Sequence, residues 1–335
     1  MTPVHQPALP AALPTAALAP LSRTQAILLE RSWRGELDEI LPRLPAFDRA
    51  PFATPGAAGH GFLDAIVRRA EPGRGLPAVP VAVVSKRYQL LPHAEAAEAV
   101  RAALAAIGVH PRDMQAEVSL AAYGARLWLA VRLPREHDFD PGDGHPMALR
   151  LVCLNSVDGS TPLRILLGWY RFVCANGLAV GTTRAEFRLV HREGMMPADV
   201  APLLKAGLEL AGREKLALRE WRATPVPAPR LAAFADGRLA DAWGVRLAAR
   251  FLHIAVTGHD AELAFPFEPG PPSAKTLTPT RRVPGSPAFA QTAWDACQAL
   301  AWLAKERRDP KERVERELQV PELMQGLVGG DVRFS

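Results

Sequence analysis

The stretch VAVVSKRYQLLPHAEAAEAVRAALAAIG, residues 81–108, opens the part of the chain whose pattern decides the fold class. Its first five residues form an apolar, β-branched run that is typical of a buried strand. After Pro92, apolar side chains recur at helical spacing as far as Ile107, and Gly108 is a typical residue at a helix end. These residues predict a strand over 81–85 and a helix over about 92–107.

The residues that follow this helix predict a run of consecutive strands. Apolar side chains alternate along residues 126–133, and Gly124 favours a hairpin that joins this segment to residues 116–122. Further candidate strands cover residues 147–154, 164–169 and 171–175. A strand, a helix and then several strands indicate an α+β fold, with a central, mostly antiparallel sheet and a packed helix, rather than the alternating pattern of a doubly wound sheet.

Outside this centre, the pattern is mainly helical. Helices are predicted over residues 198–221, 231–251, 291–305 and 310–327, with a proline-rich linker over 225–229. Nearer the start, Ser22 can cap a short helix that ends near Leu29, and a helical stretch is predicted near residues 62–69. The expected organisation is a flexible Ala/Pro tail over 1–20, an α+β core domain over 21–195 and a mainly helical C-terminal region with proline-rich linkers over 196–335.

Composition favours a cytoplasmic protein and is compatible with nucleic acid. The chain has 335 residues and a net charge of +5, and only six of its 40 basic residues are lysine. Arginine binds phosphate bidentately and stacks on bases, but a GC-rich genome imposes the same arginine-rich usage, so both explanations stay open. No apolar run is long enough to cross a bilayer, the first residues lack the pattern of a signal peptide, and the three cysteines show no CxxC spacing.

Motifs of familiar enzymes are missing from the sequence. It contains no GxGxxG, GxxxxGK[ST], HExxH or GxSxG pattern, so we expect no catalytic residues of a known kind, no metal and no cofactor. One polar set remains as a candidate ligand site: Asn155, Asp158, Ser160 and Asn176. An Asp-Gly-Ser sequence after an apolar strand is also common in hairpin turns, and the spacing does not choose between a turn and a site.

Basic residues next to aromatic residues suggest a second kind of site. A single-stranded nucleic acid is held by cations that follow its phosphates and by rings on which its bases stack. The candidate contacts are Lys86, Arg87, Tyr88, Arg164, Tyr170 and Arg171. Because half of each strand faces the core, at least one of Trp169 and Tyr170 is expected to be buried.

Five short patterns, taken together, resemble a known family. They are VSKRY (84–88), PHAEA (92–96), YGAR (123–126), NSVDGS (155–160) and CAN (174–176). In this order they resemble the phage/plasmid-like proteins that carry the domain of unknown function 932, although His93 stands where the family pattern has asparagine. The resemblance implies a protein of mobile genetic elements with a role in element maintenance, DNA handling or defence.

These observations favour a non-enzymatic protein that binds nucleic acid. We expect single-stranded DNA as the partner, in a role like annealing or recombination, and a homo-oligomer is compatible with that role. Two alternatives stay open. One is an enzyme of unknown reaction with its site around residues 155–160, and the other is an interaction or regulatory protein that acts on a host or element partner.

Overall fold

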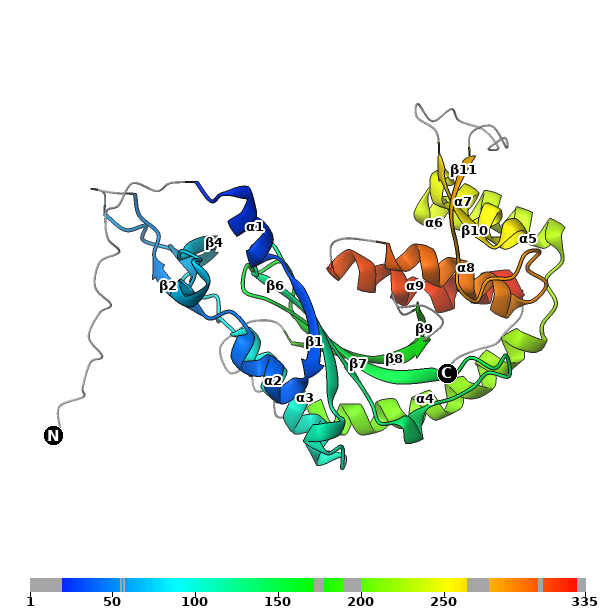
Figure 1. The fold of residues 1–335 in the computed structure, drawn as a ribbon, viewed down its shortest axis with the longest axis horizontal. Coiled ribbons are helices and arrows are strands. Elements are labelled where there is room, and N and C mark those ends of the chain that lie inside the picture. Colours follow the sequence, from blue (N-terminus) through cyan, green and yellow to red (C-terminus); the bar gives the residue numbers. More distant parts are fainter. Residues whose placement is uncertain are drawn as a thin grey trace.

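The computed structural model describes residues 20–54, 56, 58–171, 178–189, 200–263, 277–306 and 310–329, without the side chains of 171, 178–189, 203, 262–263, 277–280 and 310. The predicted α+β class is confirmed, since antiparallel sheets are combined with helices that predominate in the C-terminal part (Figure 1). No helix within these ranges is both long and apolar enough to cross a membrane.

A six-stranded antiparallel sheet forms the centre of the described structure. In spatial order its strands are β1 (Ser32–Glu36), β5 (Gln115–Ala121), β6 (Arg126–Arg132), β7 (Met147–Ser156), β8 (Leu163–Arg171) and β9 (Leu178–Leu189). The strands predicted over 116–122, 126–133, 147–154 and 164–169 are confirmed as β5 to β8. The strand expected over 171–175 falls mostly outside the described residues, because Arg171 ends β8 and residues 172–177 are not described.

Two smaller sheets stand beside the central one. The first contains β2 (Phe47–Pro51), β3 (Leu63–Arg68) and β4 (Val79–Ser85), and the second pairs β10 (His259–Leu263) with β11 (Leu277–Arg282). The predicted strand over 81–85 is therefore confirmed as part of β4. The helical stretch predicted near residues 62–69 is wrong, because Asp64, Ile66 and Arg68 are buried while the residues between them are half-buried, and this alternation is that of a strand.

Apart from α2, which the sequence does not predict, the helices lie within a few residues of their predicted positions. They are α1 (Arg23–Leu29), α2 (Leu37–Ile40), α3 (His93–Ala106), α4 (Val200–Ala223), α5 (Ala228–Phe234), α6 (Ala240–Trp243), α7 (Val245–Thr257), α8 (Ala293–Lys305) and α9 (Pro310–Val328). Ser22 caps α1 as predicted, since its side chain accepts a hydrogen bond from the Gln25 backbone N–H. The helical segment predicted over 231–251 is divided by a π-helical turn, Ala235–Leu239, and by Gly244.

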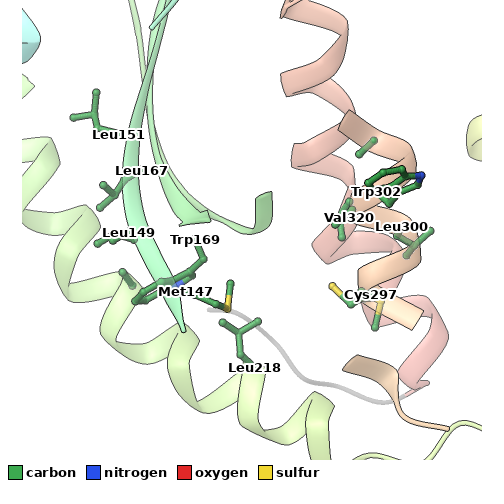
Figure 2. Packing of buried hydrophobic residues seen from close by; sticks show 14 of the residues in the cluster. Met147, Leu149, Leu151, Leu167, Trp169, Leu218, Cys297, Leu300, Trp302 and Val320 are labelled. Carbon is green, nitrogen blue, oxygen red and sulfur yellow. The ribbon is translucent and has the colours of Figure 1, made fainter. Parts of the chain in front are cut away.

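Helices cover both faces of the central sheet, with α4 along one face and α9 on the other (Figure 1). Figure 2 shows Leu149 and Trp169 on the strands that face α4, and Leu300 and Trp302 among the C-terminal helices. One buried hydrophobic cluster includes residues of the sheet, α3, α4, α8 and α9. Hydrophobic packing is thus continuous between the central sheet with α3 and the C-terminal helices.

Charged side chains anchor α9 to the second face of the sheet. Arg150 of β7 donates to Glu317 of α9 at 3.3 Å, and Arg313 donates to the same carboxylate at 3.1 Å. The Arg150 and Glu317 side chains are buried. The guanidinium groups of Arg150 and Arg313 lie 5.6 and 4.9 Å from the centre of the Trp128 ring. Helix α9 is therefore held by a buried ion pair as well as by apolar contacts.

A buried carboxyl on α4 predicts an unusual pH dependence of stability. Burial raises the pKa of Glu214 from 4.5 to about 7, so the folded protein favours the protonated form. The penalty for burying Glu214 in its ionisable form is absent below the unfolded pKa of 4.5, grows as the pH rises from there towards 7, and is constant above that. Glu214→Gln is expected to leave the free energy of unfolding unchanged at pH 4 and to raise it at pH 8 by about 3 kcal/mol.

Urea titrations of both proteins across this pH range would measure the effect. Glu209→Gln, at an exposed position of the same helix, is the matched control and should show no such pH dependence. Parallel stability curves for the wild type and Glu214→Gln would contradict the prediction.

Candidate nucleic-acid interface

The turn between β7 and β8 is built by the side chains of the NSVDGS pattern. Asp158 Oδ1 accepts a hydrogen bond from the Ser160 backbone N–H at 2.9 Å, and Gly159 has a φ of 74°, which favours glycine. The Ser156 hydroxyl donates to the carbonyl oxygen of Thr161 at 2.8 Å and accepts from its N–H at 3.0 Å. Asp158, Gly159 and Ser160 therefore have the roles expected of a structural turn.

Asn155 and His93 form a buried connection just behind this turn. Asn155 Nδ2 donates to the carbonyl oxygen of Leu91 and to His93 Nδ1, both at 3.0 Å. His93 Nε2 lies 2.9 Å from the carbonyl oxygen of Gly124, which can only accept, so His93 carries its proton on Nε2. Both side chains are buried. The amide of Asn155 thus ties the end of β7 to the start of α3 and, through His93, to the β5–β6 hairpin.

Asp158 also holds an arginine at the turn. Arg126 Nε donates to Asp158 Oδ2 at 2.8 Å. Burial alone would raise the pKa of the Asp158 carboxyl, but hydrogen bonds from Ser160 and Arg126 outweigh burial and hold this pKa below its ordinary value. A carboxylate that stays ionised and paired at neutral pH is poorly suited to general acid–base catalysis.

Four cation-bearing segments of the chain meet at or contact the same turn. Lys86 and Arg87 are exposed and directly precede Tyr88, whose hydroxyl donates to the carbonyl oxygen of Ser156 at 3.0 Å. Lys311, in the first turn of α9, donates from Nζ to the carbonyl oxygen of Ser160 at 3.3 Å. We call Lys86, Arg87, Arg126, Arg164 and Lys311 the turn-end cluster.

The register of the sheet places Arg126 and Arg164 on one face. Arg126 pairs with Ser156, Arg164 pairs with Leu154, and residues two apart on β7 point to the same side. This is the face on which Leu154 packs with Val314 of α9. Arg126 and Arg164 are therefore on the side of the sheet from which Lys311 reaches the turn.

A comparison with protein families identifies the chain's family. Residues 80–320 match the model described as "Domain of unknown function (DUF932)". The chain belongs to the DUF932 family. No curated protein and no solved structure matches the chain. The DUF932 region begins in β4 and ends in α9, so it contains every member of the turn-end cluster.

The DUF932 region does not bring all of the predicted contacts together. Tyr170 lies toward the other end of the sheet, where it pairs with Ala148, and the Arg150 guanidinium lies 4.7 Å from the centre of its ring. Trp169 is buried, as expected for one residue of the pair. The side chain of Arg171 and the whole of Asn176 are outside the described residues. Tyr88 is half-buried, and burial raises the pKa of its hydroxyl, which is bound to the turn.

Three site residues were missed by the sequence analysis. Arg126 belongs to the YGAR pattern, and that pattern was the available signal. Lys311 had no local signal, since it reaches the turn from a helix 151 residues further along the chain. Arg49 supports the Lys86–Tyr88 segment: it donates from Nη1 to the carbonyl oxygen of Lys86 at 3.2 Å and from Nη2 to that of Tyr88.

Proposed function

We propose that this DUF932 protein binds nucleic acid at the turn-end cluster, with single-stranded DNA as the favoured partner and a non-enzymatic role such as annealing or recombination. The observation that carries the proposal is that four cation-bearing segments, the residues just after β4 and the ends of β6, β8 and α9, meet at or contact one turn. Cations that come from segments far apart in the sequence suit a polyanionic chain better than a small ligand, and this supports the proposal.

The charges near the turn favour phosphate as the group that is bound. Asp158 pairs with Arg126, and Glu315 lies 4.0 Å from Lys311. Lys86 and Arg87 are exposed and form no ion pair with the described residues. An arginine carries five N–H donors, so one that binds a carboxylate through Nε can also bind phosphate through its other nitrogens.

Neutralising the two exposed cations should weaken binding and reduce its salt dependence. Each phosphate contact with a single strand contributes about 0.7 to the slope of log K against log salt. For the double variant Lys86→Gln, Arg87→Gln we expect lower affinity at every salt concentration and a slope reduced by about 1.4. Fluorescence anisotropy with a labelled single-stranded oligonucleotide, titrated at several salt concentrations, measures both effects.

A second double variant with the same net charge serves as the control. The double variant Arg69→Gln, Arg213→Gln removes two exposed cations. Arg69 directly follows β3, at the end of the β2–β3–β4 sheet opposite to Lys86, and Arg213 lies on α4. This variant should bind like the wild type. An equal loss in this control would make binding a matter of overall charge, and a folded wild type that binds no oligonucleotide at low salt would refute the proposed function.

A further inference from the structure

Three rings gather in the segment between β2 and β3, outside the DUF932 region. Phe62 is 80% exposed and Phe52 is 40% exposed. The centre of the His60 ring lies 6.4 Å from that of Phe52 and 6.3 Å from that of Phe62. We call Phe52, His60 and Phe62 the ring cluster. Large apolar rings that are exposed side by side often mark an interaction site.

Hydrogen bonds hold the ring cluster in place although it is exposed. The His60 backbone N–H donates to the carbonyl oxygen of Phe52 at 2.8 Å and closes the loop. His60 Nδ1 accepts from the backbone N–H groups of Phe62 and Leu63, each at 3.1 Å. These hydrogen bonds fix the backbone at Phe52, His60 and Phe62, so a ligand that stacks on the rings has less conformational entropy to remove.

The ring cluster lies directly beside two members of the turn-end cluster. The Lys86 backbone N–H donates to the carbonyl oxygen of Phe62 at 3.0 Å, and Leu63 pairs with Ser85. Phe62 is therefore adjacent in space to the segment that carries Lys86 and Arg87. Exposed rings next to cations are the combination with which proteins bind single-stranded nucleic acids.

We infer that the ring cluster is a base-stacking subsite, on which bases of a single strand stack while Lys86 and Arg87 hold the neighbouring phosphates. This inference rests on the proposed function and adds the reason for a single-strand preference. In a duplex, the bases are stacked on one another and are not available to the rings, whereas every base of a single strand has a free face. The flanking cations favour this occupant over an apolar protein partner.

Phe62→Ala tests the inference on three labelled oligonucleotides of equal length. These are a thymine single strand, a single strand with the same sugar–phosphate backbone but no bases, and a duplex. A stacked base contributes about 1–3 kcal/mol, so we expect roughly a tenfold loss of affinity for the thymine strand. Affinity for the abasic strand and the duplex should stay within about twofold, because neither offers a base to the ring.

Two further variants show whether the ring itself is responsible. Phe62→Tyr keeps an aromatic face and should restore binding of the thymine strand. Phe289→Ala removes a phenylalanine that is 69% exposed and lies just before α8, and it should bind all three oligonucleotides like the wild type. Because Phe62 is highly exposed, its replacement should leave the fold intact, which thermal unfolding would confirm.

The outcomes separate this inference from the proposed function. A folded wild type that binds none of the oligonucleotides refutes both. A wild type that binds the thymine and abasic strands equally, or a Phe62→Ala protein that is unchanged or equally weakened on all three, overturns the subsite and leaves phosphate binding at the turn-end cluster in place. Loss on the thymine strand alone supports the subsite.

Discussion

Glu317→Gln is expected to lower the free energy of unfolding by about 3–5 kcal/mol, because it leaves a buried arginine without its counter-ion. Glu317 is 4% exposed and accepts hydrogen bonds from Arg150 and Arg313. Burial, as the main cause, lowers the pKa of the Arg150 guanidinium, and Glu317 opposes this effect. Arginine cannot readily lose its proton, so the variant must bury an uncompensated charge or detach α9 from the sheet.

Chemical denaturation of the wild type and the variant measures this loss. Glu315→Gln is a matched control two residues away. Glu315 is 46% exposed, and its carboxylate forms a long ion pair, 4.0 Å, with Lys311. We expect this variant to change stability by less than about 0.5 kcal/mol. Replacing the pair by apolar residues, Arg150→Met with Glu317→Leu, should recover most of the loss. A Glu317→Gln protein as stable as the Glu315→Gln control would show that the arginines reach solvent.

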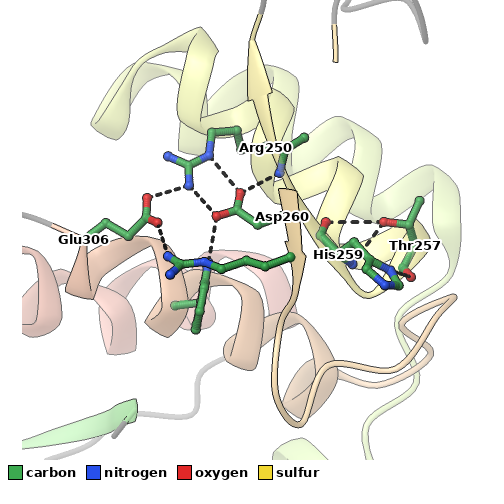
Figure 3. Close-up of polar contacts among 8 residues, drawn as sticks. Arg250, Thr257, His259, Asp260 and Glu306 are labelled. Carbon is green, nitrogen blue, oxygen red and sulfur yellow. Dashed lines mark hydrogen bonds and ion pairs between the residues drawn. The ribbon is translucent and has the colours of Figure 1, made fainter. Parts of the chain in front are cut away.

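Asp260→Asn is the second substitution expected to have a large effect, again about 3–5 kcal/mol. Asp260 accepts hydrogen bonds from Arg250 at 2.9 and 2.6 Å and from the Trp302 indole at 2.9 Å, and its carboxylate is buried (Figure 3). It thereby joins α7, β10 and α8. Asparagine keeps the size of the side chain but removes the charge, and Arg250 then has only Glu306 as its ionic partner in the described structure.

The pH dependence of this loss provides a check. Burial alone would raise the pKa of the Asp260 carboxyl, but hydrogen bonds from Arg250 and Trp302 outweigh burial and lower it. The contribution of the charge is therefore present above the ordinary pKa of aspartate and disappears as the pH falls through the lowered value. The gap between wild type and Asp260→Asn should close in acid. Glu322→Gln, at an exposed ion pair with Arg238, is the control, and an equal loss there would contradict this explanation.

Local pattern was sufficient for one helix and for the central strands. The helix now seen as α3 and the strands β5 to β8 were predicted because apolar residues repeat with the period of a helix or a strand. In residues 62–69 the same argument failed. Two of the buried residues of β3 are charged. Asp64 forms an ion pair with Arg49, and Arg68 binds Glu71 and main-chain oxygens. Hydrophobicity therefore did not reveal the alternation of β3.

The candidate site was only partly visible from the sequence. Lys86, Arg87 and Arg164 are predicted because basic residues stand near aromatic ones. Arg164 lies on β8 close to the β7–β8 turn, and Lys86 and Arg87 precede Tyr88, which is bonded to the end of β7. The same rule predicts Tyr170 as a contact. However, Tyr170 lies toward the other end of the sheet, and its ring is in contact with the Arg150 guanidinium. The sequence is compatible with both a ligand-binding and a structural role for Asn155, and the hydrogen bonds of its amide to Leu91 and His93 show a structural use.

By itself, the sequence determined the α+β class, the helix after Pro92 and the central strands, because these depend on side-chain periodicity. It left the Asp-Gly-Ser segment open between a turn and a ligand site. Only the tertiary structure decided that Arg126, Lys311 and the segment of Lys86 contact one turn and that the exposed Phe62 lies beside that segment. Such contacts arise from strand register and helix docking between residues that are distant in the chain, and no local pattern records that proximity.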